Sequence, residues 1–174
     1  MEKAQDKKRV EGSANMADLL ISIPRNIAMF DRLDEDELKV VAKYMNYRDV
    51  EPGESVFKEG EKGAYMCFVA EGELEILKKN LEGESVVIST LQTGASIGEM
   101  AVIDNFPRSA TVRAKTKGTL LTLSRYSFDT ILKQHPPIGI KLFQSLSRLL
   151  CLNLRKTSKG FADQLSRRKQ EDAP

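Results

Sequence analysis

Short apolar runs separated by glycines fill the middle of the chain. The runs ESVFK, YMCFVA, ELEILKK and SVVISTL are rich in β-branched and aromatic residues. Glycines punctuate them at intervals of 7, 12, 11 and 11 residues, at Gly53, Gly60, Gly72, Gly83 and Gly94. Short strands at this spacing, with turn residues between them, are typical of a sandwich or barrel and not of βαβ units.

Alternation within the runs also favours strands. In ELEIL, Leu74 and Ile76 fall on one face and Leu77 falls on the other, together with the two glutamates. Two further strand-like runs, ATVRA and TLLTLS, follow later in the chain. Residues 46–124 are therefore expected to form an eight-stranded β-roll.

A helical pattern precedes the β region. Residues 17–30 are apolar in part, but Pro24 interrupts them, so any helix there is short or broken. The segment LDEDELKVVAKYM at 33–45 has acidic residues in its first turn and an apolar face made of Leu38, Val41, Ala42 and Met45. We expect N-terminal helices within 17–45, after a disordered polar N-terminus at 1–16.

Two helices are predicted after the β-roll. Ser124 is placed to cap a short helix that runs to Lys133, before two consecutive prolines. A long helix is expected from Ile138 to about Lys159, roughly 33 Å if it is unbroken. These helices occupy 125–160, and the basic residues 161–174 are expected to form a frayed tail.

The long helix carries a leucine-rich stripe. Its members follow alternating steps of four and three residues: Leu142, Leu146, Leu149, Asn153 and Lys156. Such a stripe is first of all expected to cover the β-roll. The same heptad-like steps suit a seam between two helices, so the sequence favours a homodimer over a monomer.

Composition narrows the class of protein. A chain of 174 residues fits one domain, and a net charge of +2 predicts no nucleic-acid partner. No apolar stretch approaches the ~20 residues that cross a bilayer, so no membrane partner is expected. The charged N-terminus lacks the apolar core of a signal peptide, which predicts a cytoplasmic protein.

The residues that usually perform catalysis or bind metals are sparse. Cys67 and Cys151 lie far apart without metal-ligand spacing, and Cys67 sits in an apolar run that predicts a buried free thiol. His135 is the single histidine, and no second ligand or carboxylate accompanies it. The sequence therefore predicts a protein that is not an enzyme and that has no metal and no cofactor.

The segment GASIGEMAVIDNFPRSATVRA, residues 94–114, carries the candidate chemistry. Gly98 permits a tight backbone approach, and EMAVI is long enough for about one helical turn, whose first N–H groups are unpaired and suit an anion. Arg108 suits bidentate binding of a phosphate, with the Ser109 hydroxyl beside it. Glu99 is an acceptor when ionised and suits a sugar hydroxyl. A ligand containing a ribose and a phosphate would satisfy all of these groups.

The motif IGEMAVIDNFPRSATV resembles the phosphate-binding cassette of the cyclic nucleotide-binding family, which includes catabolite activator protein, protein kinase A regulatory subunits and cyclic nucleotide-gated channels. EPGESVFKEGEKGAYMCFVAEGELEIL is similar to the early strands and glycine turns of that family, and VRAKT resembles catabolite activator protein. The resemblance covers roughly residues 30–153. It implies a mainly β protein with flanking α-helices: an eight-stranded jelly-roll with N-terminal helices and a long C-terminal helix, acting as a sensor of cyclic nucleotides.

The resemblance also implies roles for single residues. Glu99 would accept a hydrogen bond from the ribose 2′-hydroxyl, and Arg108 would pair with the cyclic phosphate. The phosphate and ribose would further contact Gly98, Met100, Ala101, Ser109 and Ala110. Ile76, Ser89 and Leu91 match positions that flank the base, and Asn153 matches a polar residue that faces the purine. The last helix would cap the ligand.

The sequence specifies the base of the ligand and the downstream partner less clearly than it specifies the cassette. In kinase-type members a threonine after the arginine favours guanine and an alanine goes with adenine, and Ser109 matches neither. PRSATV resembles catabolite activator protein and a bacterial potassium channel, which favours cyclic AMP over cyclic GMP. Only about 15 residues follow the predicted long helix, too few for a helix-turn-helix, so we expect a stand-alone domain with an unknown downstream protein partner.

Three other interpretations stay open at this point. Glu99 and Arg108 could simply form a surface ion pair. The fold could also serve as a protein-interaction module that has lost its ligand. A phosphodiesterase-like enzyme would need an activated water, and the sequence offers no metal cluster for one.

Overall fold

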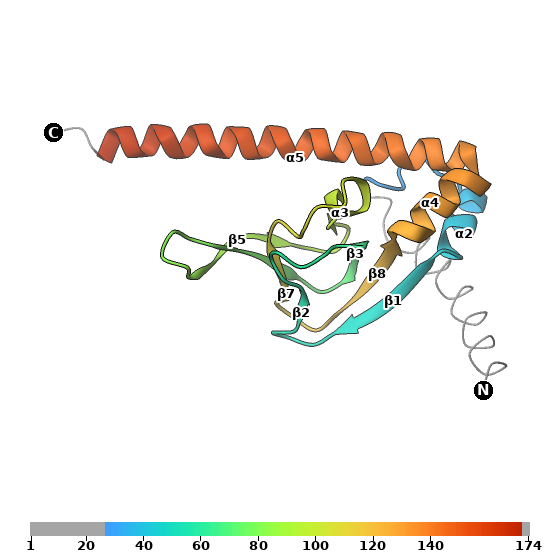
Figure 1. Cartoon of the computed structure of the whole chain (residues 1–174), viewed down its shortest axis with the longest axis horizontal. Helices are drawn as coiled ribbons and strands as arrows, with labels where there is room; N and C mark the ends of the chain where they lie inside the picture. The colour runs from blue at the N-terminus through green and yellow to red at the C-terminus, as the bar shows by residue number, and fades with distance from the viewer. Residues whose placement is uncertain (1–26, 172–174) are drawn as a thin grey trace.

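The fold is taken from a computed structural model in which residues 27–171 are described (Figure 1). The polar segment 1–16 and the start of the helical region at residue 17 lie outside the described residues. In the view of Figure 1, a β-roll lies beneath the longest helix, and shorter helices cover one end of the roll.

Twelve helices and strands make up the described part of the chain. Helix α2 (Glu35–Ala42) precedes strands β1 (Met45–Val50), β2 (Ser55–Phe57), β3 (Tyr65–Glu71), β4 (Leu74–Lys79), β5 (Ser85–Leu91) and β6 (Ser96–Ile97). The short helix α3 (Met100–Ile103) separates β6 from β7 (Thr111–Ala114) and β8 (Gly118–Ser124). Helices α4 (Arg125–Gln134) and α5 (Pro136–Glu171) follow. The mainly β fold with eight strands, flanking helices and a long C-terminal helix is confirmed.

The strands form two four-stranded antiparallel sheets. The first has the order β1-β8-β3-β6 and the second has the order β2-β7-β4-β5. The turn glycines that the spacing singled out, from Gly53 to Gly94, all have φ between 83° and 89°. Because side chains with a Cβ rarely adopt this left-handed region, the glycines mark where the chain turns between strands.

Strand β3 explains how one sheet serves two cores. Phe68 and Met66 point into a core shared with the helices, whereas Cys67 and Val69 point into the core between the sheets. Alternate residues of a strand face opposite sides, so burial on both faces produces the unbroken apolar run YMCFVA. Burial raises the pKa of the Cys67 thiol to about 12, as expected for an inert free cysteine.

One sequence-based expectation at the start of the roll needs correction. The helix expected at 33–45 ends at Ala42, and Met45 instead begins β1, where it pairs with Leu123 of β8. Leu77, which the alternation placed on the face opposite Leu74 and Ile76, is only 6% exposed. The pairing of β4 with β5 shifts its register between Ile76 and Leu77, where β5 carries one extra residue.

The C-terminal helices agree with the sequence at their start and differ at their end. Ser124 caps α4 by accepting a hydrogen bond from the backbone N–H of Ser127, as predicted. Helix α5 continues past the expected end near Lys159 to Glu171, so the expected frayed tail is helical through that residue. Gly160 is a weak helix former but costs only about 1 kcal/mol relative to alanine, which does not stop a long helix.

The half of α5 nearest its start holds the helices together. Leu142 and Leu146 are fully buried in the core shared with α2, α4 and the first sheet. Lys141 forms an ion pair with Glu37 of α2 at 2.6 Å. From Cys151 to Ser166 every residue is exposed, and Figure 1 shows this part of α5 continuing past α3 above the β4–β5 hairpin.

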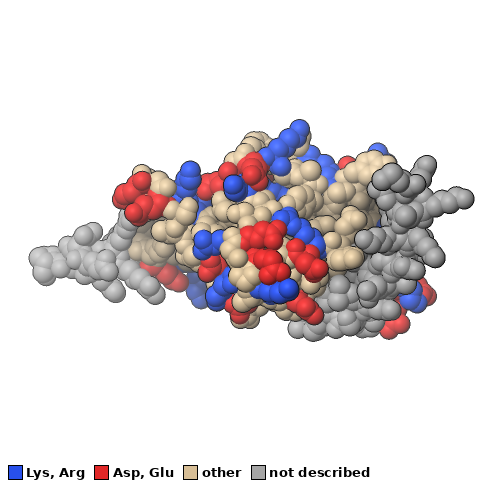
Figure 2. Space-filling view, turned by 90° about the horizontal axis from the view of Figure 1, so that it is seen from below, with Lys and Arg blue, Asp and Glu red and all other residues tan. Residues whose placement is uncertain are grey.

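The face turned away from α5 carries basic and acidic side chains in alternation (Figure 2). This mixture agrees with the small net charge of +2. Within residues 27–171, none of the helices is both long enough and apolar enough to span a bilayer.

Candidate functional site

The cassette forms a tight loop around a single helical turn. Gly98 has a φ of 82°, and a Cβ on it would overlap the Arg108 guanidinium. Glycine is therefore required there both by the backbone conformation and by the approach of the arginine. After α3 the chain turns back through Asn105, which has a φ of 60°, and Asn is among the residues that tolerate this region best.

Arg108 is buried and is held by the fold. It is 4% exposed, and its guanidinium donates to the carbonyl of Tyr65 at 2.7 Å and to that of Gly98 at 3.2 Å. The guanidinium also lies over the rings of Phe57 and Tyr65, 3.9 and 4.7 Å from their centroids. Desolvation lowers the pKa of Arg108, but an arginine keeps its charge in proteins.

No carboxylate neutralises this buried charge among the described residues. None of the eight ion pairs of the described chain includes Arg108. The surface ion pair between Glu99 and Arg108, left open by the sequence, is therefore not formed. Because a buried charge without a counter-charge is unfavourable, the arrangement suits an anionic ligand at Arg108.

Glu99 is the second buried charged residue of the cassette. It is 6% exposed, its Oε1 accepts a hydrogen bond from Asn153 Nδ2 at 3.0 Å, and its Oε2 is buried without a partner among the described residues. Burial raises the pKa of the Glu99 carboxyl, against the lowering effects of its own backbone N–H, of Asn153 and of Arg108. Oε2 of Glu99 is therefore a buried acceptor that lacks a hydrogen-bond donor among the described residues.

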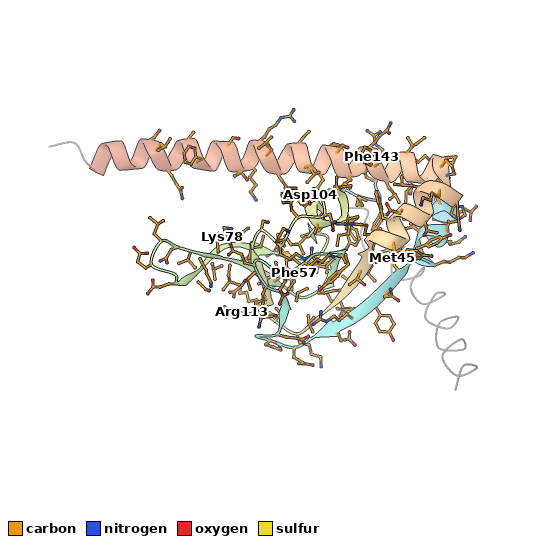
Figure 3. The ribbon with its side chains drawn as sticks, in the orientation of Figure 1. Met45, Phe57, Lys78, Asp104, Arg113 and Phe143 are labelled. Carbon is orange, nitrogen blue, oxygen red and sulfur yellow. The ribbon has the colours of Figure 1, made fainter. Side chains whose placement is uncertain are left out.

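An open pocket with a cavity volume of about 80 Å³ unites these residues. Seven of the sequence-predicted residues line it: Gly98, Glu99, Met100, Ala101, Arg108, Ser109 and Ala110. Phe57, Asp104 and Val112 also line it. Figure 3 shows Phe57 within the roll and Asp104 between the roll and α5.

The residues expected to flank the base lie one or two strands away. Ile76 in β4 pairs with Val112 of the pocket wall on one side and with Ser89 in β5 on the other. Ile76 and Leu91 pack against the core between the sheets. The pocket lining does not include Ile76, Ser89 or Leu91, and their contact with a base stays a prediction.

Asn153 reaches the site from α5, but its partner is a carboxylate. The resemblance places this residue against a purine, whereas the structure has its amide on Glu99. The resemblance thus pointed to a residue that contacts the cassette from α5, through a hydrogen bond that spans 54 residues. Contact of Asn153 with the base stays a prediction.

Several residues that shape the site were missed. Gly63 is buried where a Cβ would overlap Ala101, which lets the β2–β3 loop close over the cassette. Lys78 donates to the carbonyl of Ser109 at 2.6 Å and to Glu59 at 2.5 Å. These contacts join segments that are distant in the sequence, so no local pattern could have predicted them.

The pocket brings together groups that are suited to binding a ligand. Within the described residues there is no group of three or more His, Cys, Asp and Glu side chains able to hold a metal ion. The pocket offers one cation, Arg108, two carboxylates, those of Glu99 and Asp104, and the first N–H groups of α3, which lack intrahelical partners. Such a set matches a ligand that carries both an anion and a hydroxyl.

Comparison with known proteins decides the family. The profile described as the cyclic nucleotide-binding domain matches residues 47–135, just over half of the 174-residue chain. This chain belongs to the cyclic nucleotide-binding domain family. The matched range contains most of β1, every later strand, the whole cassette and α4.

Two curated relatives are named for different cyclic nucleotides. The chain is 38% identical over 108 residues to a cAMP-dependent protein kinase regulatory subunit of Yarrowia lipolytica, which is 62% of this chain and 28% of the relative. It is 34% identical over 110 residues to a cGMP-dependent protein kinase of Plasmodium berghei, 63% of this chain and 12% of the relative. The match therefore spans less than a third of the length of either relative.

A solved structure extends the likeness to most of the chain. A cyclic nucleotide-binding domain from Methylobacillus flagellatus superposes with a TM-score of 0.79 at 25% sequence identity. The superposition covers 88% of this chain and 86% of that one. The protein is thus a cyclic nucleotide-binding regulatory domain, and the family includes relatives named for cyclic AMP and for cyclic GMP.

Proposed function

We propose that this domain is a non-enzymatic sensor that binds cyclic AMP through the cassette at 98–110 and passes the signal to a separate protein. Arg108 pairs with the cyclic phosphate, and Glu99 accepts the ribose 2′-hydroxyl. The backbone of Gly98, Met100 and Ala101 contacts the phosphate and ribose, and Ser109 and Ala110 assist Arg108. Ile76, Ser89 and Leu91 flank the base.

One observation carries the proposal: Arg108 and Glu99 are both buried in the same pocket without neutralising each other. Arg108 is 4% exposed with no ion-pair partner among the described residues, and Glu99 keeps a buried oxygen unpaired. A purely structural pair would be expected to form the missing ion pair. A cyclic nucleotide supplies an anion to the first residue and a hydroxyl donor to the second.

The position of α5 supports capping of the ligand. Asn153 already contacts Glu99, and α5 passes over α3 in Figure 1. Ligand bound at Glu99 would share this carboxylate with Asn153 and so bias the packing of α5, which is the two-state element that a sensor requires. The signal is expected to leave through α5 toward the partner.

A thermal-melt titration with cyclic AMP, cyclic GMP and 5′-AMP tests the proposal. At about 100 times its Kd a ligand adds ~2.7 kcal/mol of stability, which raises the Tm by several degrees. We expect the largest shift with cyclic AMP and none with 5′-AMP, which lacks the cyclic phosphate. Arg108→Lys keeps the charge but loses the bidentate geometry and is expected to weaken the shift.

Each contrary result has a definite meaning. A larger shift with cyclic GMP would overturn the choice of base and leave the cassette assignment intact. No shift with either cyclic nucleotide at millimolar concentration would favour a protein-interaction module without ligand. Conversion of cyclic AMP to 5′-AMP during the titration, followed by chromatography, would identify an enzyme instead.

We further propose that the domain forms a homodimer through a face of α5 that differs from the predicted seam. The seam read from the sequence included Leu142 and Leu146, but these residues are buried in the core and cannot contact another copy. A second apolar set, here called the outer stripe, is 46–67% exposed: Ile140, Phe143, Leu154, Phe161 and Leu165. At 3.6 residues per turn it occupies a sector of roughly 60° on α5.

Substitution of the outer stripe tests the dimer. Leu154→Ser combined with Phe161→Ser is expected to convert a dimer to a monomer in sedimentation velocity, because the stripe supplies the apolar surface of the seam. Leu152→Ser is the matched control, since Leu152 is 47% exposed but lies off the stripe. A wild-type monomer, or a dimer that survives the double substitution, would rule the interface out.

A further inference from the structure

Helix α5 meets the binding pocket through one polar side chain. All residues from Cys151 to Ser166 are exposed, and among them Asn153 is the one that hydrogen-bonds to the cassette. Its amide Nδ2 donates to Oε1 of Glu99 at 3.0 Å. An amide nitrogen is a donor and an ionised carboxylate is an acceptor only, so the chemistry fixes which end of the amide faces Glu99.

The two oxygens of Glu99 are not equivalent. Oε1 has Asn153 as its donor, whereas Oε2 is buried and has no partner among the described residues. Glu99 lines the pocket and is 6% exposed, so its carboxylate has little contact with bulk water. A buried acceptor of this kind is costly until a donor reaches it.

We propose that Asn153 is a positioning residue for the ribose: it occupies Oε1 of Glu99 and thereby keeps Oε2 as the acceptor for the ligand's 2′-hydroxyl. This inference rests on the function proposed above and assigns Asn153 a task different from contact with the purine. It also makes the sugar the part of the ligand that α5 senses, because the hydroxyl and Asn153 share one carboxylate.

The geometry favours positioning over the two other roles open to Asn153. A residue that competed with the ligand would occupy the acceptor that the ligand needs, yet one oxygen is left vacant. A residue that identified the base would direct its amide at the base, yet the one hydrogen bond that the Asn153 side chain makes among the described residues goes to Glu99. Both alternatives predict different results in the same experiment.

Isothermal titration calorimetry with cyclic AMP, 2′-deoxy-cyclic AMP and cyclic GMP separates these roles. For the wild-type chain, removal of the 2′-hydroxyl is expected to weaken binding by about tenfold or more, since the hydroxyl bonds to a charged group. In Asn153→Ala this penalty is expected to shrink by about fivefold, because Glu99 loses the donor that orients it. The ratio of affinities for cyclic AMP and cyclic GMP is expected to stay unchanged.

Two further variants control for packing. Asn153→Asp keeps the shape of the side chain but replaces the donor with a second carboxylate, so it is expected to shrink the 2′-hydroxyl penalty at least as much as alanine does. Gln164→Ala removes an exposed amide from the same helix, beyond the reach of the pocket contacts, and is expected to behave as wild type. A merely structural role for Asn153 would change the affinities for all three ligands equally.

A readout without ligand separates this inference from the proposed function. The pKa of the Glu99 carboxyl, followed by carbon NMR, is expected to rise in Asn153→Ala, since the amide lowers that pKa. Wild-type binding with an unchanged 2′-hydroxyl penalty in Asn153→Ala would overturn the inference alone. Tighter binding of cyclic AMP in that variant would show competition, a changed base ratio would show base contact, and absence of any cyclic nucleotide binding by the wild type would overturn both proposals.

Discussion

The two buried charged residues of the pocket are held in opposite ways. Arg108 is fixed by two backbone carbonyls and two aromatic rings that all belong to the β-roll. Glu99 has a single side-chain donor, and that donor comes from α5. The position of the Arg108 side chain is therefore set by the β-roll alone, whereas the position of the Glu99 side chain also depends on where α5 lies.

In the proposed function, this difference would separate affinity from signalling. Arg108 is preorganised, so binding of a phosphate there would require little rearrangement of the β-roll. Glu99 would join the ligand to a helix whose residues from Cys151 to Ser166 are all exposed, and elements with few buried apolar residues are the ones that move. Three substitutions or conditions sharpen this contrast, and they are given from the largest expected effect to the smallest.

Arg108→Ala is expected to damage both the fold and the binding. The carbonyls of Gly98 and Tyr65 lose their donor and the rings of Phe57 and Tyr65 lose their cation, so the free energy of unfolding is expected to fall by about 3 kcal/mol. Urea denaturation measures this loss. A variant as stable as the wild type would mean that the arginine is held for its ligand only and would remove one side of the comparison.

Glu99→Gln is expected to separate function from stability. The amide keeps the shape of the side chain and still accepts from Asn153, but it carries no charge that burial penalises. The melting temperature without ligand is expected to stay equal or to rise, while the affinity for cyclic AMP falls by about tenfold or more because the hydroxyl loses a charged acceptor. Calorimetry measures the affinity for cyclic AMP, and thermal melts measure the stability without ligand. A loss of stability in Glu99→Gln would contradict the contrast with Arg108.

The pH dependence of stability gives the smallest expected effect. Because burial raises the pKa of Glu99 above the ordinary 4.5, the folded state holds this proton more tightly than the unfolded state does. Stability is therefore expected to fall as the pH rises from 4.5 through the raised pKa, and the affinity for ligand is expected to rise over the same interval as the carboxylate ionises.

The difference between wild type and Glu99→Gln isolates this contribution, since other carboxyls titrate in both proteins. Urea denaturation at a series of pH values is the measurement. A difference that is flat with pH would show that Glu99 has the same pKa folded and unfolded, which disagrees with its burial.

Local sequence determined the strands, the turns and the loop that carries the central residues of the candidate site. Glycines with positive φ end the strands at Gly53, Gly72 and Gly94, and the side chain of Ser124 caps α4, because these signals act through the residue itself and its near neighbours. The cassette was visible for the same reason: Gly98, Glu99 and Arg108 lie within one short loop, which brings them together in any fold that keeps the loop.

Tertiary structure alone decided which partners those residues meet. The stripe on α5 was equally suited to a core and to a seam, and only the packing of α2, α4 and the first sheet against Leu142 and Leu146 made it core. The same holds for Tyr65 beneath Arg108 and for Asn153 on Glu99, a hydrogen bond across 54 residues. Periodicity states which face of an element is apolar, but the identity of the neighbour depends on how distant elements pack, and no local pattern contains that information.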